Sequence, residues 1–119
     1  MKIAVTSQGK DLDSPVDPRF GRAAYILVVD TKTFDHEVLD NQENANALKG
    51  AGIQAASMVS ERGAEVLLTG FCGPKAFRVL DAAKIKVVND LEGTVREAVT
   101  AFNEGKLSFA DGANVEGRW

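Results

Sequence analysis

The sequence has little of several residues that define particular protein classes. Its 119 residues include one cysteine and one histidine. A single cysteine excludes an intramolecular disulfide framework, and a single histidine, His36, excludes the paired spacing of histidine-based zinc sites. There is no basic excess, because 17 Asp and Glu residues outnumber 14 Lys and Arg residues. General binding to nucleic acids or to membrane surfaces is therefore not expected.

Long apolar runs are also absent, so no segment is expected to span a bilayer. Met1 is followed within one residue by a predicted strand rather than by the regions of a signal peptide. We therefore expect a cytoplasmic protein. Apolar residues make up 45% of the chain and charged residues 26%, which is an ordinary globular composition. A chain of 119 residues can bury a core that needs no metal in order to fold.

Hydrophobic patterning predicts an α/β fold with strands and helices intermixed. Strands are expected at residues 2–7, 25–30, 34–41, 66–69 and 85–88, and helices at about 52–62, 74–83 and 91–104. The connection between the second and third strands is too short for a crossover helix, so these strands form an antiparallel hairpin. The alternating strands and helices that follow predict parallel crossovers, with the first, fourth and fifth strands parallel. The result is a mixed five-stranded sheet with helices on both faces.

Two internal segments and the C-terminal segment are predicted to be irregular. Residues 8–22 form a long polar loop, and loops of this length inside a compact domain are usually functional or mobile. Residues 42–50 are polar and expected to be loose. Residues 1–107 are predicted to form a single domain. Residues 108–119 are predicted to be a mobile tail, because apolar residues thin out there.

A glycine-rich turn joins the fourth predicted strand to the helix that follows. Gly70 and Gly73 permit backbone angles that a side chain would forbid, and Pro74 suits the first helical position. Backbone N–H groups would gather at this positive helix end beside Lys75, an arrangement that binds anions. Cys72 lies in the same turn and is expected to ionise more readily than a free thiol, which would let it ligate a soft metal. The alternative is a small cysteine that packs into the core.

A second candidate group is the segment Asp17–Arg22 in the long loop. Pro18 and Gly21 constrain its backbone. Arg19 and Arg22 could therefore converge on one object, and the planar guanidinium group suits oxyanions and other delocalised anions. The alternative is that both arginines pair with aspartates of the same loop.

Four motifs carry a family resemblance: DPRFGRA at residues 17–23, GAGI at 50–53, GFCGPKA at 70–76 and EGTVREA at 92–98. In this order they resemble the nitrogenase iron-molybdenum-cofactor binding family, also known for dinitrogenase cofactor biosynthesis, over nearly the whole chain. The resemblance implies a ribonuclease H-like three-layer fold. It also implies a preformed anionic metal-sulfur cluster as the ligand.

Within the family, the chain looks most like small members that carry a molybdenum-copper sulfide cluster without being enzymes. Carriers of the nitrogenase cofactor often have histidine before the Phe-Gly pair, whereas this sequence has Arg19, which cannot ligate a metal. The difference favours a cluster of the molybdenum-copper sulfide type over the iron-molybdenum cofactor. Such a cluster brings its own sulfide ligands and is held by charge, hydrogen bonds and apolar walls.

The predicted function is therefore non-enzymatic binding, storage or delivery of an anionic molybdenum-containing metal-sulfur cluster, with a delivery partner that would be another protein. The alternative is a module that binds a phosphorylated small molecule or a protein partner at the same turn. No catalytic residues are predicted, and Cys72 is a candidate metal ligand. The predicted cofactor-binding residues are Arg19, Phe20, Gly21, Arg22, Gly70, Phe71, Cys72, Gly73, Pro74 and Lys75.

Overall fold

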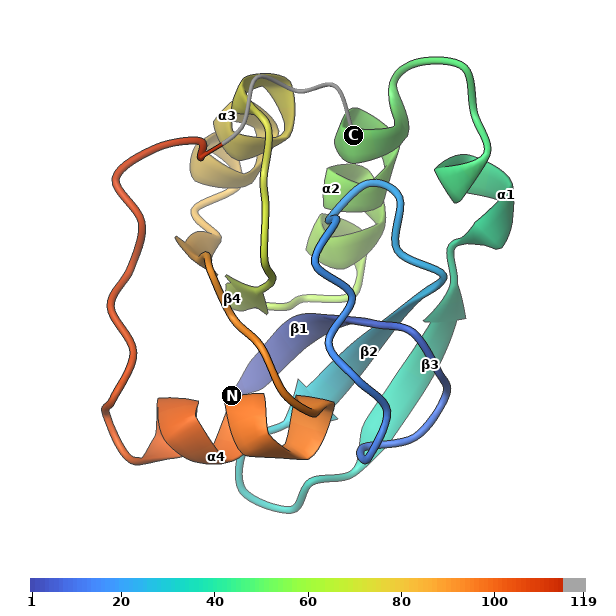
Figure 1. Ribbon diagram of the computed structural model, residues 1–119. Helices are drawn as coiled ribbons and strands as arrows, with labels where there is room; N and C mark the ends of the chain where they lie inside the picture. Colours follow the sequence, from blue (N-terminus) through green and yellow to red (C-terminus); the bar gives the residue numbers. More distant parts are fainter. Residues whose placement is uncertain (115–119) are drawn as a thin grey trace.

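The computed structural model describes residues 1–114 and contains a five-stranded sheet between helices (Figure 1). The strands are β1 (Lys2–Ser7), β2 (Tyr25–Asp30), β3 (His36–Asp40), β4 (Val66–Leu68) and β5 (Lys86–Val88). The helices are α1 (Gln42–Ala45), α2 (Ala51–Glu61), α3 (Pro74–Ala82) and α4 (Val95–Asn103). No helix within residues 1–114 is long and apolar enough to cross a membrane.

The strands lie in the order β3-β2-β1-β4-β5. β2 is antiparallel to both of its neighbours, β1 and β3. β4 is parallel to both of its neighbours, β1 and β5. The predicted antiparallel hairpin and the predicted parallel set of three strands are therefore both confirmed.

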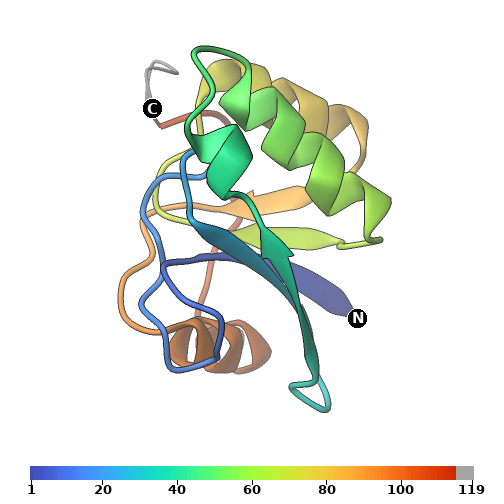
Figure 2. The same ribbon diagram turned by 90° about the vertical axis from the view of Figure 1, so that its right-hand side faces the viewer.

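Helices α2 and α3 lie side by side on one face of the sheet, and α4 covers the other face (Figure 2). Successive strand residues point to opposite faces, so each buried strand contributes to two apolar cores. Ala4 and Ile26 face α2 and α3, whereas Ile3 and Leu27 face α4. This alternation explains why the central strands β1 and β2 consist mostly of buried residues.

The start of the last helix differs from the prediction. The apolar spacing that begins at Leu91 suggests an earlier start, but α4 begins at Val95. Thr94 caps the helix, since its hydroxyl accepts a hydrogen bond from the Glu97 N–H (3.1 Å) and the Glu97 carboxylate accepts one from the Thr94 N–H (2.9 Å). This reciprocal cap fixes the helix start, and the Leu91 side chain packs on the core from the preceding loop.

Two other segments also differ from the prediction by more than a single terminal residue. The third strand is shorter than residues 34–41, because Phe34 has a positive φ of 63° and lies in the turn before β3. The polar segment 42–50 is not wholly irregular, since it contains the single turn of α1. The glycine stops are confirmed at Gly63 and Gly105, which have φ of 74° and 71° and follow the C-cap residues of α2 and α4.

The long loop 8–22 packs onto the domain instead of standing away from it. Leu12 is buried in the core beneath α4. The carbonyl oxygens of Leu12 and Ser14 accept hydrogen bonds from the N–H groups of Arg96 and Val95, at 2.8 and 3.0 Å. The loop thus covers the start of α4 before it turns back over the sheet.

The segment predicted as a mobile tail, residues 108–119, is described as far as Asn114. Within the described part, the Ala110 N–H donates a hydrogen bond to the carbonyl oxygen of Val87 in β5 (2.7 Å). The segment therefore lies along the outer edge of the sheet. Its mobility stays a prediction, and residues 115–119 lie outside the described residues.

Two close backbone approaches explain why glycine occurs where the long loop meets its neighbours. A Cβ atom on Gly21 would lie 2.6 Å from the backbone nitrogen of Gly52, in the first turn of α2. A Cβ atom on Gly70 would lie 2.7 Å from the Cα atom of Pro18. Both distances are too short for a real Cβ contact, so any larger residue would push the loop away from α2 or from the turn before α3.

We predict that Gly21→Ala lowers the free energy of unfolding by about 1 to 3 kcal/mol, because the added methyl group has no space against the α2 backbone. Urea unfolding followed by circular dichroism measures the change. Gly112→Ala is the matched control, since a Cβ there meets nothing within 4 Å. Equal stability of the two variants would contradict the close approach.

Candidate functional site

The long loop and the glycine-rich turn meet directly at one end of the sheet. The Phe71 N–H donates a hydrogen bond to the Pro18 carbonyl (2.6 Å), and the Phe20 N–H donates one to the Phe71 carbonyl (3.1 Å). Arg19 and Phe71 are thereby paired in a short parallel bridge outside the five strands. The two sequence motifs therefore lie side by side, as their positions after β1 and β4 predict.

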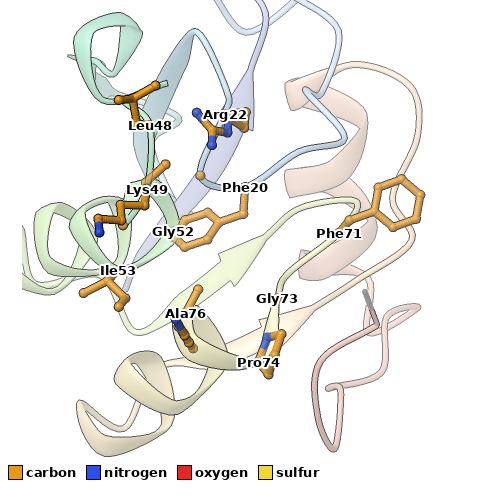
Figure 3. Close-up of a pocket in the computed structure, with 14 residues that line it drawn as sticks. Phe20, Arg22, Leu48, Lys49, Gly52, Ile53, Phe71, Gly73, Pro74 and Ala76 are labelled. Carbon is orange, nitrogen blue, oxygen red and sulfur yellow. The ribbon is translucent and has the colours of Figure 1, made fainter. Parts of the chain in front are cut away.

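Beside this junction a cavity of about 490 Å³ opens between the loop, α2 and α3 (Figure 3). Most of the predicted site residues contribute to its walls. Those that line it are Phe20, Gly21, Arg22, Phe71, Gly73, Pro74 and Lys75. In the described structure, Arg19, Gly70 and Cys72 are not among the lining residues.

The other wall of the cavity is missing from the sequence-based prediction. It is formed by the start of α2 and the residues just before it, with Ala76 of α3 beside them. The GAGI motif at residues 50–53 was a signal for this wall, since two glycines at a helix start permit close approach to a ligand. The missed residues are Leu48, Lys49, Gly50, Ala51, Gly52, Ile53 and Ala76.

The charged residues that line the cavity are all cationic. Arg22, Lys49 and Lys75 contribute the charge, and none of the described lining residues is acidic. The whole chain has a formal charge of −3, so the charge of the cavity lining is opposite in sign to the net charge of the chain. A concave surface of one sign attracts a ligand of the opposite sign, here an anion.

The starts of α2 and α3 add to this positive character. Gly50 and Gly73 are their N-cap residues, and among the described residues neither helix has a side-chain cap hydrogen bond or an acid in its first turn. By contrast, α4 carries the Thr94–Glu97 cap on the other face of the sheet. The first N–H groups of a helix lack partners within the helix, and they carry its positive dipole end. Two such ends border the cavity.

Arg22 has a structural role that the sequence did not reveal. Its Nη1 donates hydrogen bonds to the carbonyl oxygens of Ala45 (2.8 Å) and Ala47 (2.5 Å), between α1 and α2. The side chain extends toward the segment that carries Leu48 (Figure 3). Arg22 therefore holds the α1–α2 connection against the cavity and lines the cavity at the same time. Among the described residues it makes no ion pair with an aspartate, so the predicted alternative does not apply to it.

Arg19, in contrast, follows the ion-pair alternative. Its Nε lies 3.5 Å from the Oδ1 atom of Asp17, whose side chain is only 3% exposed. The same carboxylate oxygen accepts a hydrogen bond from the Arg19 N–H (3.0 Å). The Arg19 side chain is directed to its own loop and stays outside the cavity walls.

The expectation that Cys72 ionises readily is wrong. Cys72 is fully buried in the core between the sheet and helices α2 and α3. Burial raises the pKa of the Cys72 thiol to about 12. The free-energy cost of removing the thiolate from water exceeds the stabilisation that the nearby helix end and the exposed Lys75 provide. Ligation of a metal by Cys72 stays a prediction, and it would require the side chain to leave the core.

The cavity is better suited to a complete anion than to a bare metal ion. Within residues 1–114, no group of three or more His, Cys, Asp or Glu side chains could hold a metal ion. His36 lies away from the cavity, with its Nε2 atom 3.3 Å from the Lys10 carbonyl oxygen. Backbone N–H groups and cations bind anions, and they do not coordinate metals.

The chain belongs to the dinitrogenase iron-molybdenum cofactor family, which matches residues 1–105. It is similar to the apo form of the orange protein from Desulfovibrio gigas, with 52% identity and a TM-score of 0.93 over 96% of each chain. A NifB-like protein from Thermotoga is 39% identical, with a TM-score of 0.83 over 98% of each chain. An uncharacterized protein of Methanocaldococcus jannaschii is 28% identical over 110 residues, which cover 90% of this chain and 89% of that protein. The predicted family and the mixed α/β fold are thereby confirmed.

We predict that the buried thiol makes the protein less stable at alkaline pH. Because the folded-state pKa of Cys72 is about 12 and its ordinary value is 9.0, the unfolded chain loses the proton first. The stabilisation is complete below pH 9 and declines as the pH rises toward 12. Urea unfolding at several pH values measures the change.

Cys72→Ala isolates this contribution, since it removes the thiol and leaves the other titrating groups in place. The difference in unfolding free energy between wild type and Cys72→Ala should be constant at neutral pH and should decline above pH 9. A difference that stays constant as the pH rises above 9 would show that the thiol is not shielded from water.

Proposed function

We propose that this protein binds an anionic molybdenum-containing metal-sulfur cluster and carries it without chemical conversion. One observation carries the proposal: the cavity has three cations and no acid among its described lining residues, and it is bordered by two helix starts that lack side-chain cap hydrogen bonds. Membership in the dinitrogenase iron-molybdenum cofactor family supports a metal-sulfur cluster as the cargo. As a carrier, the protein would receive the cluster from a protein partner or pass it to one.

The lining residues fit such a cargo in three ways. Lys49 and Lys75 offer charged N–H donors, and the first N–H groups of α2 and α3 offer neutral ones. Phe20, Ile53 and Pro74 offer apolar walls, which suit soft and weakly hydrated sulfides. The cluster would supply its own sulfide ligands, because the cavity offers no set of metal-binding side chains within the described residues.

A molybdenum-copper sulfide cluster is favoured over the iron-molybdenum cofactor. In the carriers of the iron-molybdenum cofactor that this sequence resembles, the residue before the Phe-Gly pair is often histidine, whereas Arg19 cannot ligate a metal and lies outside the cavity lining. The resemblance of the sequence to small family members that carry a molybdenum-copper sulfide cluster supports the same preference. A ligand held only by charge, hydrogen bonds and apolar contact must arrive with its metals already coordinated, and a sulfide-rich cluster meets this requirement.

A phosphorylated small molecule is the alternative cargo. Helix N-termini and lysines bind phosphate groups as well as they bind other anions, so the cavity alone does not separate the two. The family membership favours the cluster. Competition by inorganic phosphate separates the two cargoes experimentally, because a site built for phosphate would release thiomolybdate when phosphate is added.

We predict that apo protein takes up tetrathiomolybdate together with copper(I) and develops a visible charge-transfer band that stays with the protein on gel filtration. Lys49→Ala and Lys75→Ala should each raise the Kd about fivefold, the effect of losing one exposed charged contact of about 1 kcal/mol. Lys86→Ala is the matched control, since Lys86 is an exposed lysine of β5 outside the cavity lining.

Added salt should weaken uptake, since screening reduces attraction between exposed charges. Equal uptake by wild type, both lysine variants and the control would show that the cluster binds elsewhere. Metal analysis of protein isolated from its native host gives an independent check, and a preparation without molybdenum would contradict the proposed cargo.

We also predict that Cys72→Ala takes up the cluster with a Kd close to that of wild type. The thiol is buried outside the cavity lining, so its removal takes no ligand from the cluster. The measurement is the same visible titration. Abolished uptake, with normal folding by circular dichroism, would instead establish a metal-thiolate bond and a large rearrangement of the turn.

A further inference from the structure

The C-terminal segment ends its described part on the outer side of the glycine-rich turn. The Asn114 side chain contacts the turn backbone twice: its Oδ1 accepts from the Cys72 N–H (2.8 Å), and its Nδ2 donates to the Gly70 carbonyl (2.9 Å). The backbone N–H of Asn114 also donates to the Cys72 carbonyl (3.2 Å). A further contact joins Nδ2 to the Oδ1 of Asp90 (3.2 Å). One residue therefore makes four hydrogen bonds at this place.

The chemistry of the carboxamide explains why asparagine suits this position. The Asn side chain combines an acceptor and a donor in one plane, as a peptide group does, so it can pair with a backbone N–H and a backbone carbonyl together. Without it, the Cys72 N–H would have no partner in the turn, and a buried, unpaired N–H is costly. Asn114 thus gives the turn backbone a hydrogen-bond acceptor and a donor, as the backbone of a neighbouring strand would.

The opposite side of the turn is held by the long loop. Phe71 donates to Pro18 and accepts from Phe20, so its two backbone groups are committed there. The N–H and carbonyl groups of Cys72 both bond to Asn114, and the Gly70 carbonyl accepts from the Asn114 side chain as well as from the Asp90 N–H (2.8 Å). The turn is therefore clamped from two sides by segments that are far apart in the sequence.

The path of the C-terminal segment supports this role. After α4 it passes along the edge of the sheet toward the start of α3 (Figure 1). The Ala110 N–H donates to the Val87 carbonyl (2.7 Å), and the Asn89 side chain donates to the Gly112 carbonyl (3.5 Å). These contacts hold the segment so that Asn114 lies against the turn.

We propose that Asn114 is a positioning residue for the cavity: by clamping residues 70–72 it fixes the start of α3 at the cavity wall and keeps the Cys72 thiol in the core. Gly73, Pro74 and Lys75 follow the clamped residues directly and line the cavity. Loss of the clamp should therefore loosen this wall. The consequence for cluster binding rests on the proposed function, whereas the consequence for the thiol does not.

The single cysteine of the chain is a built-in reporter for the clamp. The test measures how fast Ellman's reagent labels Cys72 in the folded apo protein. Asn114→Ala should label about fivefold to tenfold faster than wild type, the effect of losing a net hydrogen-bond contribution of ordinary size. Asn103→Ala is the matched control, since its Nδ2 donates to the Thr31 carbonyl (2.8 Å) away from the turn. Its labelling rate should equal that of wild type.

Exchanging the amide and the carboxylate between positions 114 and 90 tests the contact between these two side chains. Asn114→Asp removes the donor to Gly70 and places a second carboxylate beside Asp90, so labelling should be faster than in wild type. The double variant Asp90→Asn with Asn114→Asp restores an amide–carboxylate pair and should label more slowly than Asn114→Asp alone. Asparagine tolerates the positive φ of 65° at position 90. No slowing in the double variant would overturn the assigned contact.

Titration with tetrathiomolybdate and copper(I) completes the experiment. Faster labelling together with a Kd raised about fivefold in Asn114→Ala supports the full inference. Unchanged labelling overturns the clamp, whatever the cluster does. Faster labelling with an unchanged Kd overturns the role in cavity positioning. If wild type takes up no cluster, the proposed function fails, and the labelling rates still decide whether the clamp exists.

Discussion

Two backbone hydrogen bonds between Phe71 and the long loop determine how the site is assembled. They pair the Phe71 N–H with the Pro18 carbonyl and the Phe71 carbonyl with the Phe20 N–H. They form only because Gly70 has no side chain to collide with Pro18. With the loop fixed in this way, Gly21 reaches the first turn of α2 at backbone contact distance. The cavity is the space left between three segments that this junction brings together.

The same junction explains why the cavity is not directly above the strand ends. In open α/β sheets, ligands usually bind outside the carboxyl ends of the strands, where neighbouring connections diverge. Here that position is filled by the loop. The Thr6 hydroxyl donates to the Asp17 carbonyl (2.6 Å), and the hydroxyls of Thr6 and Thr69 lie 2.9 Å apart. The available space therefore lies to one side, where it is bordered by the N-termini of α2 and α3.

The sequence predicted those parts of the structure that depend on local pattern. Strand alternation, helix periodicity and glycine stops depend on neighbours in the chain, and β1 and β2 have the predicted boundaries. The environment of Cys72 was mispredicted, because a local argument about the helix end cannot tell which side of the turn faces the core. The carbonyl partners of Arg22 and the contacts of Asn114 were also not foreseen. They join residues that are 23 to 44 positions apart and that no sequence pattern connects.

The contrast among the helix starts is the strongest physical indication of a binding role. The chain satisfies the start of α4 completely, with the Thr94–Glu97 cap and two loop carbonyls. It leaves α2 and α3 without side-chain caps at the cavity, among the described residues. Both helices have glycine N-caps, which cost only roughly a few tenths of a kcal/mol relative to Ser, Thr, Asn or Asp, and their first N–H groups are left without side-chain acceptors. An incoming anion could accept hydrogen bonds from these N–H groups. The cations and backbone N–H groups at the cavity would contact only the outer atoms of a bound anionic cluster and would form no bond to its metals. A cargo held in this way can leave without breaking a coordination bond, which is what release by a carrier requires.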